Sequence, residues 1–310
     1  MQLIRGINNI QPEDHGCVLT IGNFDGVHLG HQRVINALIE KAKAHNAVPT
    51  VMVFEPQPQE LFGGDKAPAR LTRLRDKYHL LAKLGVKRLM CVNFNQSFAS
   101  MTAPVFIEEL LIKQLGVKHL IIGDDFRFGQ HRQGDFRMLK AYGERLGFTV
   151  TDTASFKFDD CRISSTEIRK ALEQDHLSEA ARMLGRDYAI SGKVFHGDKN
   201  GRKFGFPTAN VLLKRRVSPV SGVYAVKVKH DEKEYFGVAN IGCRPTLAGV
   251  RQQLEVHIFD FNADLYGQHI EVAMLKKLRS ERKFDSVTAL TEQIKIDSDQ
   301  ARAFVASLVQ

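Results

Sequence analysis

Helical segments in the first half of the chain repeatedly end on a glycine that leads directly into an apolar run. The tetrapeptide Leu-Gly-Val-Lys stands at 84–87 and again at 115–118, and its first two residues recur as Leu146-Gly147. Glycine ends a helix readily because it adopts the left-handed conformation without steric cost. Repeated helix–strand units of this length predict a parallel sheet with helices on both faces.

Apolar and β-branched runs give the order of this sheet, and segments with helical spacing of apolar residues lie between them. Thr102 is a suitable cap for one of these helices, because Pro104 follows in its first turn. Ligands of such sheets bind beyond the carboxyl ends of the strands. The expected strands are 17–21, 48–54, 87–92, 119–122 and 148–151, and the expected helices are 31–45, 71–84 and 102–116.

The pattern changes near residue 186, after two further helical segments at 165–174 and 177–184. Short strand-like runs follow, separated by Gly, Pro, Asn and Asp, and in one of them Tyr224, Val226 and Val228 alternate with other residues. Such runs predict a small antiparallel barrel, which a helix at 287–308 would close. The expected strands are 188–195, 222–229, 235–241, 253–261 and 269–275. The chain is therefore expected to be an α/β protein with a doubly wound parallel-sheet domain at 1–185 and a barrel domain with a terminal helix at 186–310.

Composition excludes several classes of protein. No apolar run approaches the roughly 20 residues that span a bilayer, and the first residues lack the apolar stretch of a signal peptide. We therefore expect a cytoplasmic protein with no membrane partner. The net charge of +9 suits anionic partners, either nucleic acid or phosphorylated small molecules. No two cysteines form a CxxC pair, so we expect reduced core thiols at Cys17, Cys91, Cys161 and Cys243.

The strongest local feature is the loop Gly22–His31, GNFDGVHLGH, which follows the first strand and opens the first helix. A helix N-terminus attracts anions, and two histidines three residues apart share one face of a helix. Without a covalent nucleophile, such a loop favours direct displacement at phosphorus, catalysed by positioning and charge. The alternative is a glycine-rich turn with two surface histidines. The candidate catalytic residues are His28 and His31, and the candidate phosphate-binding residues are Gly22, Asn23, Phe24, Asp25, Gly26 and Gly30.

A second segment, Ile163–Arg169, reads ISSTEIR. Ser165 and Thr166 can cap the helix that follows, and the Arg169 guanidinium can fork onto a phosphate. Together with the histidine loop, this segment resembles the signature of the nucleotidyltransferase superfamily. The resemblance implies a nucleotidyltransferase-like first domain. It also implies that the triphosphate of ATP meets Ser164, Ser165, Thr166 and Arg169, the last as a catalytic residue.

Two aromatic segments end expected strands, where a ligand of this fold belongs. Residues 54–58 read FEPQP and residues 123–129 read GDDFRFG. Their rings can stack on a flat ring system, with core packing as the alternative. They resemble the N-terminal module of prokaryotic bifunctional FAD synthetases, although many members carry His where this chain has Gln57. The implied flavin-binding residues are Asp125, Phe126, Arg127 and Phe128.

The barrel carries a second glycine-rich region, from Gly192 to Asn210, which lacks the GxxxxGK[ST] pattern of a Walker loop. Thr208 and Asn210 lie two residues apart, so an extended chain points both side chains the same way. A hydroxyl and an amide carbonyl are suitable oxygen ligands for Mg²⁺. A plain Gly/Pro-rich loop is the alternative. The candidate phosphate-binding residues are Gly192, Lys193, Gly197, Gly201, Arg202, Gly205 and Pro207.

Glu255 is the only acidic residue between Val250 and Phe259 in an otherwise apolar strand. Its carboxylate could accept the proton of a hydroxyl that attacks a γ-phosphate, or it could be an exposed residue on the outer face. Four further segments, together with the run Pro207-Thr208-Ala209-Asn210, resemble the riboflavin kinase module. These segments are 237–242, 244–246, 254–257 and 278–284. That resemblance implies that Glu255 is the catalytic base, that Thr208 and Asn210 hold the metal, and that Arg279 to Phe284 form a mobile flap over flavin, with Arg279 and Phe284 binding it.

The resemblance covers essentially the whole chain and implies two reactions. Riboflavin and MgATP would give FMN and ADP, and FMN and ATP would then give FAD and pyrophosphate. The partners would be riboflavin, FMN and ATP without nucleic acid, and a monomer is the simplest expectation for an oligomeric state that the sequence leaves open. Two alternatives remain: a class I aminoacyl-tRNA synthetase, which uses a similar histidine loop, and a barrel that senses flavin or binds nucleic acid without catalysis.

Overall fold

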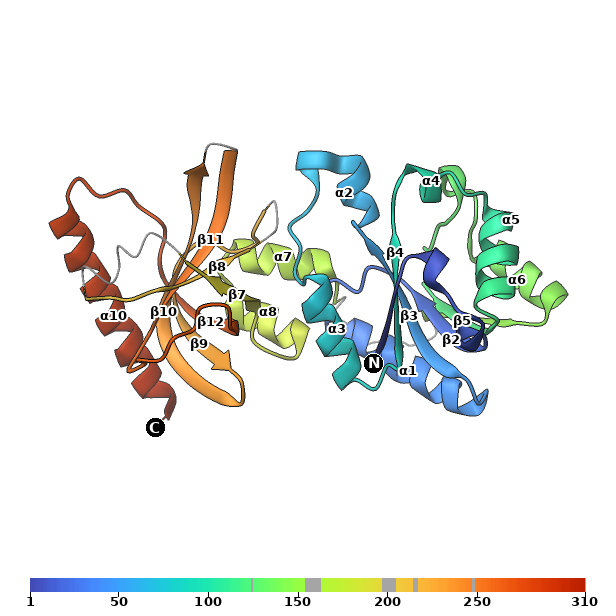
Figure 1. The fold of residues 1–310 in the computed structure, drawn as a ribbon, viewed down its shortest axis with the longest axis horizontal. Helices are drawn as coiled ribbons and strands as arrows, with labels where there is room; N and C mark the ends of the chain where they lie inside the picture. Colours follow the sequence, from blue (N-terminus) through green and yellow to red (C-terminus); the bar gives the residue numbers. More distant parts are fainter. Residues whose placement is uncertain (124, 154–162, 197–204, 214–216, 247–248, 310) are drawn as a thin grey trace. The chain divides into compact units, whose positions relative to one another are not determined.

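The computed structural model describes residues 1–309, apart from residue 124 and the segments 154–162, 197–204, 214–216 and 247–248 (Figure 1). The chain forms two compact units. The first comprises Met1–Pro68 and Thr72–Ser164, and the second comprises Ala69–Leu71 and Ser165–Gln310. The expected fold class, a parallel α/β sheet followed by an antiparallel barrel with a terminal helix, is confirmed.

The first unit contains a six-stranded sheet in the order β1-β4-β3-β2-β5-β6, and all of its strand pairs are parallel. Strand β2 lies between β3 and β5, so the connections from the middle of the sheet leave in opposite directions. The edge strand β1 was not expected, because four residues are too few to show a periodic pattern. The strands are β1 (Gln2–Arg5), β2 (Cys17–Ile21), β3 (Val48–Glu55), β4 (Arg88–Asn93), β5 (Val117–Ile122) and β6 (Thr149–Asp152).

Helices cover both faces of this sheet, because successive strand residues point to opposite sides. Val18 packs in one cluster with residues of α1 (Leu29–Ala44) and α3 (Leu74–Lys83). Leu19 packs in another with η4 (Phe106–Gln114) and α6 (Phe136–Leu146). The helix expected at 102–116 is present as a short α5 (Ala103–Val105) that continues as the π-helix η4. The shorter elements are α2 (Pro58–Gly63), α4 (Gln96–Ala99), η1 (Ile7–Asn9), η2 (Pro12–Asp14), η3 (Gly64–Lys66) and η5 (Gln130–Arg132).

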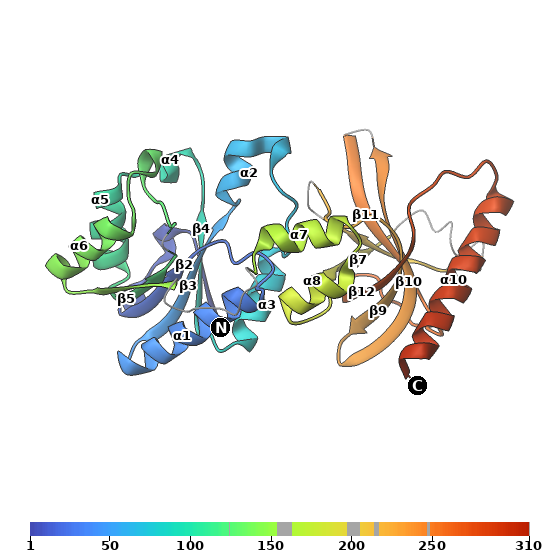
Figure 2. The ribbon, with the colours of Figure 1, turned by 180° about the vertical axis from the view of Figure 1, so that it is seen from behind.

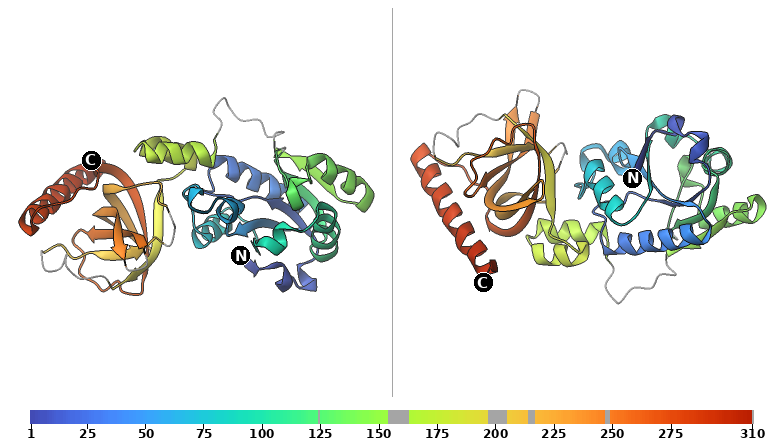
Figure 3. Two further views of the ribbon diagram at one scale, coloured as in Figure 1. Left: turned by 90° about the horizontal axis from the view of Figure 1, so that it is seen from above. Right: turned by 60° about the horizontal axis from the view of Figure 1, so that its bottom comes forward.

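The second unit is built on a closed barrel in the order β10-β11-β8-β7-β12-β9 (Figure 3). As the alternation predicts, Tyr224, Val226 and Val228 all belong to the barrel's buried core. Strand β8 was not expected, because its residues continue the glycine-rich segment directly. The strands are β7 (Ala189–Phe195), β8 (Ala209–Leu212), β9 (Gly222–His230), β10 (Lys233–Thr246), β11 (Gly249–Ile258) and β12 (His269–Arg279).

In the described part of the second unit, three helices accompany the barrel (Figure 2). Apolar residues of α7 (Ser165–Glu173) and α8 (Leu177–Leu184) belong to the same buried cluster as the barrel interior. The last helix, α10 (Val287–Val309), instead packs Ala301 against the outer face of the barrel, where it meets Val223 and Val238. Helix α10 therefore covers the outer face of the barrel at β9 and β10.

Cys17 and Cys91 are buried and form no disulfide bond, and burial raises the pKa of Cys17 to about 12. Cys161 and the Cys243 side chain lie outside the described part of the structure. No helix among the described residues is long and apolar enough to cross a membrane.

Candidate active sites

The histidine loop follows β2, and residues 123–128 follow the neighbouring strand β5. These are the two strands at which the connections of the sheet diverge. In doubly wound folds the crevice beyond the carboxyl ends of such strands is where ligands bind. The first unit thus brings together two segments that the sequence predicts as ligand-binding.

The two histidines form a stacked pair at the start of α1. His28 is the N-cap residue, and its Nδ1 accepts a hydrogen bond of 3.3 Å from the backbone N–H of His31. The ring centroids lie 3.6 Å apart. Desolvation, with smaller effects of His28 and Lys77, lowers the pKa of His31 well below its usual value. The His31 ring is therefore neutral, and its buried Nδ1 has no hydrogen-bond partner among the described residues.

The loop before α1 has a strained backbone. Hydrogen bonds of Thr72 with Asp25 and Gly26, here called the latch, hold the loop in place. Phe24 and Val27 have φ angles of 47° and 42°, which side chains with a Cβ seldom adopt. The buried Asp25 carboxylate accepts bonds of 2.9 Å from the backbone N–H and 3.1 Å from the hydroxyl of Thr72. That hydroxyl in turn accepts a bond of 2.9 Å from the Gly26 N–H.

The structure gives two of the candidate loop residues contacts within the protein. Phe24 is buried in the core against α1 and α3, and the Asp25 carboxylate is engaged with Thr72. Both residues therefore shape the loop in this structure. Gly22 and Asn23 are half-buried at its start and stay candidates for contact with phosphate.

Gly30 is required by close packing. A Cβ at this position would lie 3.1 Å from the His28 ring and 3.6 Å from the carbonyl oxygen of Ile163. The first residue of the ISSTEIR segment therefore lies beside the histidine loop. This contact lies wholly within the first unit.

The rest of that segment is divided between the units. Ser164 belongs to the first, whereas Ser165, Thr166 and Arg169 belong to the second. Ser165 begins α7, and Arg169 donates from Nε to the carbonyl oxygen of Ala69 at 2.6 Å. A role of these residues in binding triphosphate stays a prediction.

The segment after β5 separates into core and surface positions. Phe128 is buried, with its ring 5.2 Å from that of Phe106. Phe126 is half-buried and stacks on Phe128, with the two ring centroids 5.6 Å apart. Asp125 and Arg127 are exposed. Phe128 thus has a packing role, while the other three remain accessible to a ligand.

Sequence reasoning missed an aromatic group at the same edge of the sheet. Phe62 of α2 is 67% exposed. Its ring centroid lies 5.9 Å from that of Phe94, whose ring centroid lies 5.9 Å from that of Phe98. These rings come from separate segments, so no local pattern joins them. Gln57, the N-cap residue of α2, is buried, and its Nε2 has no hydrogen-bond partner among the described residues.

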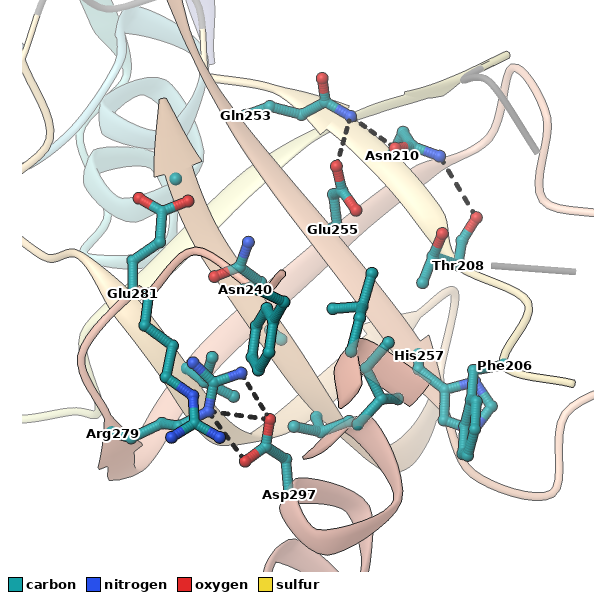
Figure 4. A pocket seen from close by; sticks show the side chains of 18 of the residues that line it. Phe206, Thr208, Asn210, Asn240, Gln253, Glu255, His257, Arg279, Glu281 and Asp297 are labelled. Atoms are coloured by element: carbon teal, nitrogen blue, oxygen red, sulfur yellow. Dashed lines mark hydrogen bonds and ion pairs between the residues drawn. The ribbon is translucent and has the colours of Figure 1, made fainter. Parts of the chain in front are cut away.

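The second unit contains a cavity of about 670 Å³ on the outer face of the barrel (Figure 4). Strands β8, β10 and β11 form one wall, and the segment after β12 together with α10 forms the other. Apolar side chains make up much of the lining, as a flat ring system requires. They include Phe206, Val223, Val238, Phe284, Leu290 and Ile294.

A polar network crosses one wall of this cavity. Glu255 on β11 lies opposite Asn210 on β8 and opposite Asn240 on β10. The Nε2 atom of Gln253 donates to Asn210 Oδ1 and, at 3.4 Å, to Glu255 Oε1. Asn210 Nδ2 donates to the Thr208 carbonyl oxygen at 3.3 Å. As expected from the sequence, Thr208 and Asn210 line the same cavity, beside Glu255.

The segment leading into β8 connects two cavities. Thr208 also lines a second cavity of about 300 Å³, together with Pro207 and Tyr266. His257 Nδ1 donates to the Pro207 carbonyl oxygen at 2.9 Å and so holds this segment on β11.

The other candidates of the glycine-rich region are only partly described. Gly192 and the exposed Lys193 lie in β7, and Gly205 has a φ angle of 81°. Gly197, Gly201 and Arg202 lie outside the described residues.

Arg279 is anchored at the edge of the larger cavity by a residue that the sequence did not single out. Its Nε and Nη2 atoms donate to the buried Asp297 carboxylate of α10, with the shortest distance 2.8 Å. The guanidinium groups of Arg279 and Arg282 lie 5.6 and 4.8 Å from the Phe284 ring centroid. An acidic partner eighteen residues away on a helix leaves no local signal in the sequence.

A histidine-bearing loop on a doubly wound sheet and a polar network in a barrel cavity are the arrangement expected of an enzyme that transfers phosphoryl or nucleotidyl groups. Residues 10–167 match the FAD synthetase family model, and residues 184–305 match the riboflavin kinase model. The chain belongs to the family of bifunctional riboflavin kinase/FMN adenylyltransferases, which excludes the two alternative classes considered above.

Curated relatives match along the whole chain. The bifunctional riboflavin kinase/FMN adenylyltransferase of Escherichia coli K12 is 55% identical over 306 residues, which cover 98% of each chain. That of Haemophilus influenzae is 53% identical over 308 residues, covering 99% of this chain and 100% of the relative. A solved structure named as a macrolide-efflux protein from Streptococcus pneumoniae has 31% identity and a TM-score of 0.78, and the match covers 97% of this chain and 99% of the other. That likeness concerns the fold of both units.

The family matches also bear on the boundary between the domains. The match to the FAD synthetase model ends at residue 167, and the match to the riboflavin kinase model begins at residue 184. Helices α7 and α8 occupy most of the interval, and they belong to the second compact unit. The two compact units divide between Ser164 and Ser165, so the boundary near residue 185 stays a prediction.

Proposed function

We propose that this bifunctional enzyme phosphorylates riboflavin in the barrel cavity around Glu255 and adenylylates FMN at the histidine loop before α1. The family assignment establishes the two activities and the use of ATP. The proposal concerns which residues carry them, with functional domains at 1–185 and 186–310. The observation that carries it is the polar network of Glu255, Gln253 and Asn210 on the wall of a largely apolar cavity.

In the kinase reaction, Glu255 accepts the proton of the ribityl hydroxyl that attacks the γ-phosphorus of ATP. The P–O bond to ADP breaks as the bond to riboflavin forms, giving FMN. Glu255 is half-buried and lies between two asparagines, so its carboxylate is held in a defined position. The apolar lining, with Phe206 and Phe284, suits the isoalloxazine ring.

A magnesium ion brought in with ATP fits the residues at this wall. The Thr208 hydroxyl and the Asn210 carboxamide oxygen are hard donors that border the same cavity as Glu255. Bound there, Mg²⁺ would neutralise charge on the transferring phosphoryl group. Because Thr208 lines both cavities, the smaller one is a suitable place for the nucleotide, with the reacting groups meeting at Thr208.

In the adenylyl transfer, the FMN phosphate attacks the α-phosphorus of the second ATP and pyrophosphate leaves. His28 and His31, with the positive end of the α1 dipole, stabilise the charge that develops on the phosphate oxygens. The neutral His31 ring suits a hydrogen-bonding role without proton transfer. Asp125, Phe126 and Arg127, at the end of the neighbouring strand, are the proposed flavin contacts.

Two single substitutions test the assignment of the sites. His31→Ala should reduce FAD formation by roughly 10²- to 10³-fold, as expected for loss of one donor to developing charge, while FMN accumulates. Glu255→Ala should block FMN formation, yet FMN supplied directly should still become FAD. Chromatography of the flavin products measures both steps in each protein.

Exposed residues of the same types provide matched controls. His79→Ala on α3 and Glu271→Ala on β12 should leave both activities unchanged, since both side chains are exposed. If His31→Ala and Glu255→Ala each abolished both reactions in folded protein, the assignment of one reaction to each site would be wrong.

A further inference from the structure

Gln253 has a position in the kinase site that neither the sequence nor the family likeness pointed out. It lies on β11 two residues before Glu255, so both side chains point to the same side of the strand. It is only 8% exposed and lines the larger cavity. Figure 4 shows dashed lines from its amide nitrogen to both Glu255 and Asn210.

The polarity of the Gln253 amide is fixed by its neighbour. An ionised carboxylate only accepts hydrogen bonds, so the Gln253 nitrogen must face Glu255. The same nitrogen donates its other proton to Asn210 Oδ1. Asn210 must then turn its own NH₂ group toward the Thr208 carbonyl oxygen, where the bond is observed.

This order matters because a carboxamide has one end that binds cations and one that repels them. Only the oxygen of Asn210 can serve as a ligand for Mg²⁺. A carbonyl oxygen has two lone pairs, so the bond from Gln253 leaves one available. Without a donor at position 253, the Asn210 amide would lose one of the two bonds that distinguish its ends.

We propose that Gln253 is a positioning residue of the kinase site, whose amide NH₂ group holds the Glu255 carboxylate and the Asn210 carboxamide oxygen in their orientations. The inference rests on the proposed roles of Glu255 as base and Asn210 as metal ligand. The hydrogen bonds of Gln253 to its neighbours go to Glu255 and Asn210. Its effect is exerted through these two neighbours.

Gln253→Met tests this role, because methionine is similar in length but donates no hydrogen bond. Loss of the donor to Asn210 should raise the Mg²⁺ concentration that gives half-maximal FMN formation about tenfold. Loss of the donor to Glu255 should shift the acidic limb of the kinase pH profile to higher pH, because hydrogen bonds to a carboxylate favour its charged form. The KM for riboflavin should change less than twofold.

The same preparation supplies an internal control for the first unit. Conversion of supplied FMN to FAD takes place in the other unit and should be unchanged. Gln268→Met, the same substitution at an exposed position, should leave both reactions unchanged. If the Gln253→Met substitution prevents the barrel from folding, Gln253→Leu also removes the donor without adding a charge and should show the same magnesium effect.

A double substitution separates positioning from a general packing effect. In an Asn210→Ala background, Gln253→Met should raise the magnesium requirement less than twofold further, because the residue it acts through is gone. A full additional tenfold effect would overturn the proposal. So would a Gln253→Met enzyme with wild-type magnesium and pH dependence, or one whose kcat fell equally at every magnesium concentration and pH.

The outcomes also distinguish this inference from the proposed function. If Glu255→Gln still formed FMN at the normal rate, the assignment of Glu255 as base would fail, and the positioning role with it. If Glu255→Gln were inactive while Gln253→Met behaved as wild type, only the positioning role would fail.

Discussion

The latch between Thr72 and the histidine loop should control adenylyl transfer without affecting phosphorylation of riboflavin. Thr72→Val removes the hydroxyl but keeps the shape of the side chain. It deletes the bond from the Gly26 N–H and the bond to Asp25, while the backbone bond from Thr72 to Asp25 can remain. The Thr72 side chain is buried, so water does not readily replace these bonds.

The expected loss can be estimated from these two bonds. A neutral hydrogen bond contributes about 1 kcal/mol net, and one to a charged acceptor about 1.5–3 kcal/mol. Thr72→Val should therefore lower the free energy of unfolding of the first unit by about 2.5–4 kcal/mol. Phe24 and Val27 hold conformations that cost about 1–3 kcal/mol each, so a loosened loop should relax away from its present shape.

Relaxation of the loop should reduce catalysis. A displacement of about 1 Å in a positioning element can cost roughly 10²-fold in rate. We expect FAD formation from FMN to fall by one to two orders of magnitude, with FMN formation unchanged. Urea unfolding and separate assays of the two reactions measure both effects.

Thr72→Ser is the matched control, because it keeps the hydroxyl and should retain most of the stability and activity. The reasoning would be refuted if Thr72→Val lost stability as estimated but kept full adenylyltransferase activity. It would also be refuted if the serine and valine variants behaved alike.

Two further predictions concern a buried histidine and the anchor of the kinase cavity. Desolvation, and then the charges of Lys41 and His45, lower the pKa of His119 from 6.5 to about 4. The unfolded chain therefore takes up a proton before the folded one does, so the free energy of unfolding should fall as the pH drops from about 6.5 to about 4. His119→Gln should flatten that part of the stability–pH curve in urea unfolding, and an unchanged slope would contradict the assignment. Asp297→Asn weakens the charged anchor of Arg279 and should raise the KM for riboflavin about tenfold while FMN adenylylation stays constant, whereas equal losses in both reactions would indicate general unfolding instead.

The fold could be read from the sequence where local rules and burial agree. The glycines at 85, 116 and 147 all have positive φ angles and lead into Val86, β5 and β6, as the repeated pattern predicts. Two strands were missed for different reasons. Strand β1 is too short to show a pattern, and its place at the sheet edge depends on pairing with β4. Strand β8 follows a proline-containing loop, and pairing with β7 and β11 defines it.

Residue types and spacing selected several residues that line one cavity, but they did not predict the orientation of every side chain. Thr208, Asn210 and Glu255 do line one cavity. By contrast, Phe24 and Phe128 are buried in the core, although their neighbours in sequence make them look like ligand contacts. An aromatic ring serves a core or a flavin equally well, and only the packing of distant helices decides which.

Strand β11 shows why the sequence alone leaves the role of Glu255 undecided. Leu254, Val256 and Ile258 point into the barrel core, so the alternate residues Gln253, Glu255 and His257 must point outward. On a bare barrel an outward carboxylate would be an ordinary solvated charge. Here the segment after β12 and helix α10 enclose that outer face as a cavity. The site therefore arises from the covering of a strand by elements further along the chain, and a substitution that detaches α10 should return Glu255 to an ordinary surface position.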